Sequence, residues 1–357
     1  MGTANRVQKL RQQLASLDLG AILITNSYNR YYLTGFTGTS GYVLVTHDRA
    51  FFLTDFRYVT QASQQAQGFE IVEHKANPME TVRELLQGLG IAELGFEQMD
   101  VTYGQHAEYA KTLEGIRLVP TNSVVERLRM YKDEEELAII QEAADLADKT
   151  FQHILGFLKP GVSERDVALE MEFYMRANKA ASSSFDTIVA SGVRSAMPHG
   201  VASDKVLETG DFVTLDFGAL YNRYCSDLTR TVVLGTPTEK QRDIYNIVLE
   251  AQQYCLDHLK PGMTGREGDA LARKIIAQYG YGDYFGHGTG HSFGLEIHEA
   301  PRLSPTCDVV LEPGMTMTVE PGIYLPEFGG VRIEDDIVIT ETGVKVLTRS
   351  PKELLRI

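Results

Sequence analysis

The sequence predicts an α/β domain followed by an α+β domain with an internal duplication, and three observations support this prediction. The first 120 or so residues alternate apolar strand segments with amphipathic helices, as an α/β domain does. A long helical stripe of apolar residues begins after Asp133. A motif then recurs at an offset of 101 residues (259 − 158), as expected for two related halves. We place the domains at residues 1–125 and 126–357.

The N-terminal domain is expected to contain short strands between helices. The expected helices are residues 5–17 and Thr81–Gln87, and the expected strands are Ala21–Ile24, Gly41–Val45, Arg49–Leu53 and Leu94–Glu97. A turn at His47-Asp48 joins two of these strands. The run Pro120-Thr121-Asn122-Ser123 has the composition of a domain boundary.

The second domain is predicted to open on a long amphipathic helix. Its apolar stripe consists of Leu137, Ile140, Ala144, Ala147, Phe151, Ile154 and Leu158. Acidic residues 133–136 fall in the first turn, where the helix dipole favours negative charge. Lys159-Pro160-Gly161 ends the helix.

The repeated motif follows this helix. Leu158–Arg165 recurs as Leu259–Arg266, and in each copy helices flank the motif and strands come later. A chance recurrence of a helix–loop–helix connection is the plain alternative. Duplication with pseudo-twofold symmetry explains more, because Asp216 lies 56 residues after Pro160 and Glu320 lies 59 after Pro261. Each half would then supply a pair of acids to one central site.

Composition and charge exclude several classes of protein. Hydrophobic residues make up 43% and charged residues 23%, a balance typical of soluble globular proteins. The net charge of −14 argues against a nucleic-acid partner. No stretch has the length and hydropathy of a membrane span or a signal peptide. The three cysteines are widely spaced, which favours a reducing compartment, so we expect a cytoplasmic protein.

Two acids are expected to face each other across a first hairpin. Residues 211–219 alternate in a way that places Thr214 and Asp216 on one face of a strand. A turn centred at Tyr221/Asn222 would bring Asp227 directly opposite Asp216. Like charges at about 5 Å destabilise a ladder, whereas a divalent cation between them removes the repulsion.

A second hairpin repeats this arrangement. Met315–Glu320 and Val331–Thr340 are expected strands, joined by a turn at residues 327–330. Glu320 and Glu334 would then face each other. Apolar residues on the opposite face of the second strand indicate that this strand is buried, so the acids on its polar face require an explanation.

Three of the nine histidines lie close together in a glycine-rich segment. His287, His291 and His298 fall within residues 286–298. A lone histidine is more often a surface or core residue, but this density favours a site. Four carboxylates and an imidazole suit Mn²⁺ and tolerate Co²⁺, Fe²⁺ or Zn²⁺. A calcium site would lack the imidazole, and a glycosidase needs only one carboxylate pair.

These residues resemble those of the pita-bread metallopeptidase family, which includes methionine aminopeptidase, aminopeptidase P and prolidase. The matching segments are Thr214–Gly218, Ser226–Thr231, Gly290–Gly294, Val319–Tyr324 and Val331–Asp336. The residues Asp, Asp, His, Glu and Glu occur in the family's order. Residues 1–125 are similar to the N-terminal domain of the aminopeptidase P and prolidase branch, on the basis of Tyr32–Phe36 and Thr54–Tyr58.

The resemblance implies a site with two divalent metal ions, Mn²⁺ being favoured. Its ligands would be Asp216, Asp227, His291, Glu320 and Glu334, with Asp227 and Glu334 shared by both ions. The ions would activate water for attack on the peptide carbonyl.

The resemblance also assigns roles around the metals. Glu320 would shuttle the proton of the water, and His298 would stabilise the oxygen of the tetrahedral intermediate. His199 would be an active-site histidine, and His287 would line the pocket near proline. Arg332 would hold that wall or a substrate carboxylate, or would pair with a neighbouring acid.

The expected activity is that of an Xaa-Pro aminopeptidase acting on short peptides. An Xaa-Pro dipeptidase shares all five ligands and is the alternative, and activity like that of methionine aminopeptidase is a further one. A metal-free creatinase-like hydrolase and a peptide-binding module are disfavoured, because the chain keeps every ligand. Relatives with this N-terminal domain lead us to expect a homodimer.

Overall fold

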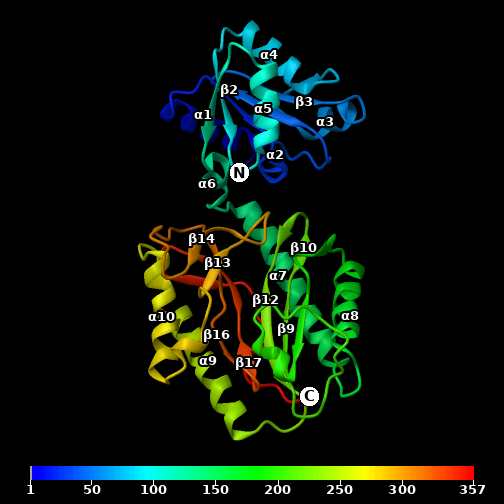
Figure 1. Ribbon diagram of the computed structural model, residues 1–357, viewed down its shortest axis with the longest axis vertical. Helices are drawn as coiled ribbons and strands as arrows, with labels where there is room; N and C mark the ends of the chain where they lie inside the picture. Colours follow the sequence, from blue (N-terminus) through cyan, green and yellow to red (C-terminus); the bar gives the residue numbers. More distant parts are fainter. Residues whose placement is uncertain (1) are drawn as a thin grey trace. The chain divides into compact units, whose positions relative to one another are not determined.

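The computed structural model describes residues 2–357. Contacts divide the chain into two compact units, of which one ends at Arg129 and the other spans Met130–Ile357. Figure 1 shows that helices pack on strands in both units. Each unit is described here by itself.

The first unit is a six-stranded sheet with helices, in which β1–β6 form one sheet with strand order β4-β3-β2-β1-β5-β6. In chain order its elements are α1 (Thr3–Ser16), β1 (Ala21–Ile24), α2 (Ser27–Thr34), β2 (Tyr42–Thr46), β3 (Ala50–Thr54), α3 (Val59–Gln65), β4 (Glu70–Glu73), α4 (Pro78–Gly88), β5 (Glu93–Glu97), α5 (Tyr103–Thr112), β6 (Arg117–Thr121) and α6 (Val124–Arg129). Strands β1, β2 and β3 run antiparallel, whereas β3–β4, β1–β5 and β5–β6 are parallel pairs.

Pro120 lies within the last strand of this sheet. It is paired with Phe96 in β5, and β6 is an edge strand, the place in a sheet that tolerates proline. The segment therefore continues the sheet, and the first unit includes α6 beyond it.

The second unit consists of two helix pairs and several small sheets. In chain order its elements are α7 (Glu134–Leu155), α8 (Glu164–Ala177), β7 (Ser182–Ser183), β8 (Ile188–Ser191), the 3₁₀ helix η1 (Gly192–Ala196), β9 (Phe212–Phe217), β10 (Ala219–Tyr221), β11 (Tyr224–Cys225), β12 (Leu228–Val233), α9 (Glu239–His258), α10 (Gly265–Gln278), η2 (Gly282–Tyr284), β13 (Gly290–Ser292), β14 (Glu299–Leu303), β15 (Thr316–Val319), β16 (Gly322–Leu325), β17 (Gly329–Arg332), β18 (Asp335–Ile339) and β19 (Val344–Val346). In Figure 1, α7 and α8 accompany the strands of the first half, and α9 and α10 those of the second.

The two halves repeat each other in detail. Ser163 and Thr264 each close a capping box at the start of α8 and α10. In the first half the N–H of Gly161 donates to the carbonyl of Leu207, and in the second that of Gly262 donates to Leu311. This shared pattern supports a true duplication, and the fold class predicted from the sequence is confirmed.

The first hairpin turns one residue later than expected. Tyr221 pairs with Tyr224, so Asn222 and Arg223 form a two-residue turn. Both residues have positive φ, 44° and 72°, as the tight turns preferred in hairpins require. The predicted centre at Tyr221/Asn222 was therefore wrong, because the twist-matched turn takes Asn222 and Arg223 as its central pair.

The shifted turn changes the partner of Asp216. In the β9–β12 ladder Asp216 lies opposite Thr229, and Asp227 lies two residues before Thr229, just ahead of β12. The two aspartates are therefore diagonal neighbours and not a direct cross-strand pair, as we had predicted. Diagonal positions still share one face of the hairpin.

The second hairpin has the expected register but is interrupted. β15 pairs with β18 and β16 pairs with β17 in one register that continues across the break, which places Glu320 opposite Glu334. The predicted strand Met315–Glu320 corresponds to β15, which ends one residue before Glu320, and the predicted strand Val331–Thr340 divides at Ile333 and Glu334 into β17 and β18. Both glutamates thus lie where the pairing of the two strands is interrupted.

Each half has its own hydrophobic core. The first core includes Phe151, Met171 and Phe217, and the second includes Tyr245, Ile276 and Ile337, all buried. The acids lie on the strand faces turned away from these apolar side chains, so the cores fix the strands that position the site.

Candidate metal centre and active site

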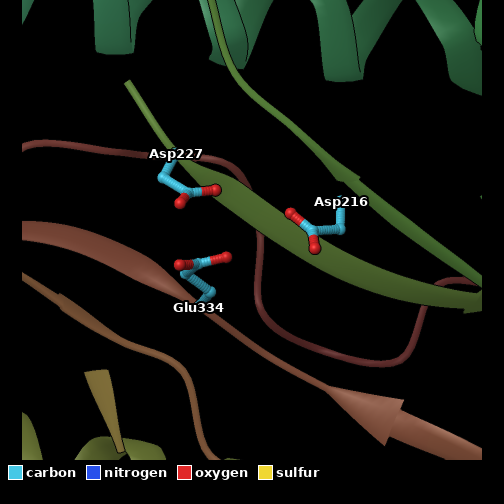
Figure 2. A group of neighbouring side chains, drawn as sticks. All are labelled: Asp216, Asp227 and Glu334. Carbon is cyan, nitrogen blue, oxygen red and sulfur yellow. The ribbon is translucent and has the colours of Figure 1, made fainter. Parts of the chain in front are cut away.

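Three carboxylates converge between the two halves of the second unit. Figure 2 shows Asp216, Asp227 and Glu334 pointing toward one another, and one oxygen of each lies within 4.8 Å of the others. Asp216 comes from β9, Asp227 from just before β12, and Glu334 from the gap between β17 and β18. All three are buried.

His291 and Glu320 complete the group. His291 Nε2 lies 3.4 Å from Glu320 Oε1 and 3.7 Å from Asp227 Oδ2. Its other nitrogen, Nδ1, lies 3.2 Å from the carbonyl oxygen of Ser292, which accepts the ring proton there and leaves the Nε2 lone pair facing the acids. Burial lowers the pKa of His291 to about 3, so the ring is neutral. The structure thus brings together all five residues predicted as ligands.

The protein alone does not balance the charge of these acids. Burial, followed by the neighbouring acids, raises the pKa values of Asp227 and Glu334 well above their usual range. Burial also raises the pKa of Glu320 to about 7. Among the described residues, buried Asp227 Oδ1 and Glu334 Oε1 accept no hydrogen bond. Buried carboxylate oxygens without partners, beside a neutral imidazole, are the donors that divalent cations need, so the residues fit a metal centre.

Glu334 and Glu320 each have one oxygen fixed by a threonine hydroxyl. Thr229 Oγ1 donates to Glu334 Oε2 at 2.5 Å, and Thr318 Oγ1 donates to Glu320 Oε1 at 3.0 Å. The N–H of Asp227 donates to the carboxylate of Asp336, whose other oxygen also lacks a partner among the described residues. Hydrogen bonds of this kind orient ligands before a metal binds.

Thermal stability of the metal-free protein should fall as pH rises from about 6.5 to 8. The pKa of Glu320 in the folded protein is about 7, so over the lower part of this range the folded protein still holds a proton there that the unfolded chain has lost. The raised pKa values of Asp227 and Glu334 act in the same direction. The folded state then binds more protons, so raising the pH destabilises it until the folded acids are also ionised. Below about pH 6.5, His287 and His291 have the opposite effect on stability. Their pKa values in the folded protein are lowered to about 4 and about 3, so the unfolded chain binds more protons and stability rises with pH.

Melting curves of the chelator-treated protein between pH 6.5 and 8 test this prediction. The metal-loaded protein should show a flatter pH dependence, because bound cations keep the acids ionised. A melting temperature of the stripped protein that rises over this range would contradict the charge balance described above.

All three guanidinium nitrogens of Arg332 donate hydrogen bonds to protein acceptors. Its Nη2 donates to Asp216 Oδ2 at 2.5 Å and its Nε donates to Thr229 Oγ1 at 3.1 Å. Its Nη1 donates to the hydroxyl of Tyr324 at 2.9 Å and to the carbonyl of Pro198 at 3.2 Å. Of the two roles left open by the sequence, the contacts are those of an ion pair with a neighbouring acid.

Tyr324 links Arg332 to His287. The tyrosine hydroxyl lies 2.8 Å from His287 Nε2, and His287 Nδ1 lies 2.7 Å from the carbonyl oxygen of Gly288. The carbonyl can only accept, so Nδ1 carries the proton and the tyrosine donates to Nε2. Sequence reasoning gave Tyr324 no role, although its spacing of four from Glu320 places it on the same strand face.

The four acids line a cavity of about 380 Å³. His199, His287 and His298 all line it, together with apolar residues such as Phe185, Ile188 and Val201. The ring of His298 packs edge-on against that of His291, with 4.5 Å between the centroids. Every residue predicted from the sequence to bind substrate therefore borders this one cavity.

A buried acid on a helix holds an active-site loop in each half. In the first half Glu164 of α8 accepts the N–H groups of Ser191 and Ser203 at 2.8 and 3.1 Å, on either side of His199. In the second half Asp269 of α10 accepts the N–H of Thr289 at 2.9 Å, next to the His287 loop. Sequence analysis missed both acids, because their partners lie 20 or more residues away.

Two glycines allow backbone segments to approach beside the ligands. A Cβ at Gly218 would lie 1.7 Å from the carbonyl oxygen of Ser226, and one at Gly290 would lie 1.9 Å from that of Thr318. Neither position has room for a side chain. Glycine is therefore required two residues after Asp216 and directly before His291.

A duplicated α+β unit with five convergent acid and imidazole ligands and an adjoining cavity defines a metal-dependent hydrolase. The chain belongs to metallopeptidase family M24, which it matches over residues 138–341. Residues 6–131 match the creatinase/prolidase N-terminal domain. The predicted family and the prediction of a metal-dependent peptidase are thereby confirmed.

Several proteins that are similar over nearly the whole chain are Xaa-Pro peptidases. The chain is 43% identical to an Xaa-Pro dipeptidase of Pyrococcus horikoshii, with 98% of each chain covered. The structure of an Xaa-Pro dipeptidase from Bacillus anthracis shares 54% identity and superposes with a TM-score of 0.98 over 100% of both chains. That of an X-Pro aminopeptidase from Thermotoga maritima shares 37% identity, with a TM-score of 0.90 over 97% of this chain and 100% of that one.

None of the helices formed by residues 2–357 combines the length and hydropathy needed to cross a bilayer.

Proposed function

We propose that the protein is an Xaa-Pro dipeptidase that uses two divalent metal ions, preferably Mn²⁺. The ligands would be the five residues Asp216, Asp227, His291, Glu320 and Glu334. The observation that carries the proposal is the group of buried carboxylates with unpartnered oxygens facing a small cavity. Mn²⁺ is preferred because the donors are mainly carboxylate oxygens with one imidazole.

The dipeptidase activity is preferred over the aminopeptidase activity that the sequence alone favoured. Dipeptidases are similar to this chain over its whole length at 54% and 43% identity, against 37% for the aminopeptidase. The Thermotoga structure keeps the Xaa-Pro aminopeptidase as the second candidate, since its fold differs little from this one.

The chain's own residues supply the remaining chemistry. Bound metal ions would lower the pKa of water and polarise the scissile carbonyl. Glu320, whose pKa near 7 in the metal-free protein shows how readily it holds a proton, would accept the proton of the attacking water and pass it to the proline nitrogen. His298 would donate to the oxygen that gains charge. His287, held neutral by burial, would shape the wall beside the proline ring.

Parallel assays of two substrates test the proposal. The protein is stripped with a chelator, reloaded with Mn²⁺ or Co²⁺, and offered Ala-Pro and Ala-Pro-Ala while release of alanine is followed. We expect the dipeptide to be cleaved faster and chelation to abolish the reaction. Preferential cleavage of the tripeptide would establish the aminopeptidase, and cleavage of neither would reject the proline specificity.

A further inference from the structure

A buried lysine lies against the β13–β14 hairpin of the second half. Lys132 comes just before α7, and its side chain is 1% exposed. Its Nζ donates to Glu299 Oε2 at 3.0 Å and lies 3.4 Å from the hydroxyl oxygen of Ser292. The N–H of Lys132 donates to the carbonyl of Gly314 at 2.9 Å, so the backbone of the lysine is fixed as well.

The two partners of the lysine each directly follow a site histidine. Ser292 follows His291, and Glu299 follows His298. Ser292 and Glu299 also pair with each other across the hairpin. Both histidines line the cavity, whereas Ser292, Glu299 and Lys132 do not. The histidines therefore face the cavity, and the residues that follow them face the ammonium group of the lysine, as successive residues of a strand do.

The carboxylate of Glu299 also closes the loop that connects the two strands, residues 293–298. Its Oε1 accepts the N–H of Glu296 at 3.2 Å, while its Oε2 accepts Lys132. A Cβ at Gly294 would lie 2.9 Å from Lys132 Cε and 3.1 Å from both carboxylate oxygens of Glu299. The backbone of the loop thus packs directly on the ion pair, and the loop ends at His298.

The ring of His298 depends on this loop for its position. His287 is held at both ring nitrogens and His291 at Nδ1. Within residues 2–357 the ring of His298 makes no hydrogen bond, and it packs edge-on against His291. A group that stabilises a developing oxyanion must lie about 3 Å from that oxygen. The backbone that carries His298 must therefore be placed accurately.

We propose that the Lys132–Glu299 ion pair positions His298, which makes Lys132 a positioning residue of the reaction although it lies outside the cavity. The inference rests on the proposed function, in which His298 donates to the oxygen of the tetrahedral intermediate. A displacement of about 1 Å is enough to impair such a contact. The contact forms as charge develops on the oxygen, so its loss should lower kcat and leave KM nearly unchanged.

Cleavage of Ala-Pro by the Mn²⁺-saturated protein tests the proposal. Lys132→Met keeps an unbranched side chain but removes the ammonium group, and we expect kcat to fall about 10- to 100-fold. In a His298→Ala background the same substitution should cause no further fall, because the residue through which Lys132 acts is gone. Lys75→Met is the control, since Lys75 pairs with Glu84 in the first unit while both side chains are more than half exposed, and it should leave kcat unchanged.

A double variant separates positioning from stability. Lys132→Met leaves the carboxylate of Glu299 buried without its lysine, so the melting temperature should fall together with kcat. Adding Glu299→Gln removes that charge. The melting temperature should then recover in part, whereas kcat should stay low, because the loop still lacks its ion pair.

The outcomes separate the inference from the proposed function. A kcat that recovers together with the melting temperature in the double variant would overturn the inference, since the ion pair would then act on stability alone. An unchanged kcat in Lys132→Met, or a fall by the same factor with and without His298, would also overturn it while leaving an Xaa-Pro peptidase. If the wild type cleaves no proline substrate, the proposed function fails and the inference fails with it.

Discussion

Glu334→Gln should abolish peptide hydrolysis and at the same time raise the melting temperature of the metal-free protein. The loss of activity should be at least about 10³-fold, since a shared ligand of the metal centre is removed. The gain in stability follows from the burial of Glu334 among other acids: burial first, and the charges of Glu320 and Asp216 second, raise its pKa. Glu334 in turn adds to the effect of burial in raising the pKa of Asp227. A neutral amide ends this repulsion, and its NH₂ group offers a donor to Asp227 Oδ1, which otherwise accepts no hydrogen bond from the described residues.

Metal-free and Mn²⁺-loaded samples of the wild type and of Glu334→Gln should be melted side by side at pH 8. Glu341→Gln is the matched control, because Glu341 is an exposed acid just beyond β18 on the same hairpin. We expect metal to stabilise the wild type and the control strongly, and Glu334→Gln little. A variant that is less stable than the metal-free wild type would show that crowding of the acids is not what limits stability.

Arg230→Met should destabilise the protein by about 3–5 kcal/mol, the usual result of removing one partner of a buried ion pair. Arg230 is 1% exposed, and its Nη2 donates to Asp335 Oδ1 and to the carbonyl of Ser350, at 2.8 and 2.7 Å. Its Nη1 donates to the carbonyls of Thr229 and Glu334. The substitution leaves Asp335 and these carbonyls with fewer partners in the interior, so several buried acceptors lose their bonds together.

Urea denaturation measures this loss. Arg266→Met is the control, because Arg266 pairs with Asp308 while both side chains are more than half exposed. The control should cost less than about 1 kcal/mol. Replacing Asp335 by Asn in the Arg230→Met background should recover part of the stability, since the buried charge that has lost its arginine partner is then removed. A loss no larger than that of the control would mean that Lys352, which also bonds Asp335, compensates fully.

The identity of the candidate ligands could be predicted from sequence because it depends on local patterns. Alternation within each strand places Asp216 and Glu334 on polar faces, and the second hairpin has the register that its length suggests. The start of the second helix of each half is equally local, since Ser163 and Thr264 form capping boxes with residues three positions further on. These features depend on residues that are close together in the sequence and not on contacts with distant segments.

Other features depend on contacts between distant segments and could not be predicted. The first hairpin turned at Asn222-Arg223 because strand twist selects two residues of positive φ, which alternation alone does not reveal. The pairing of Ile188 with Asp216, which brings a residue of the cavity wall beside a metal ligand, joins strands that are far apart in the chain. The bond of Asp269 to Thr289 crosses from a helix to a loop, and no spacing rule connects the two.

The internal duplication has a consequence for the symmetry of catalysis. Two separate identical chains around a twofold axis must present the same residues to a shared site. Fusion into one polypeptide removes that requirement, and here one copy provides two aspartates while the other provides a histidine and two glutamates. The charged residues that line the cavity also differ between the copies, since the first copy contributes Asp186 and the second contributes Arg302. Divergence of the copies thus gives the site a direction, which a reaction with distinct amino and carboxyl sides requires.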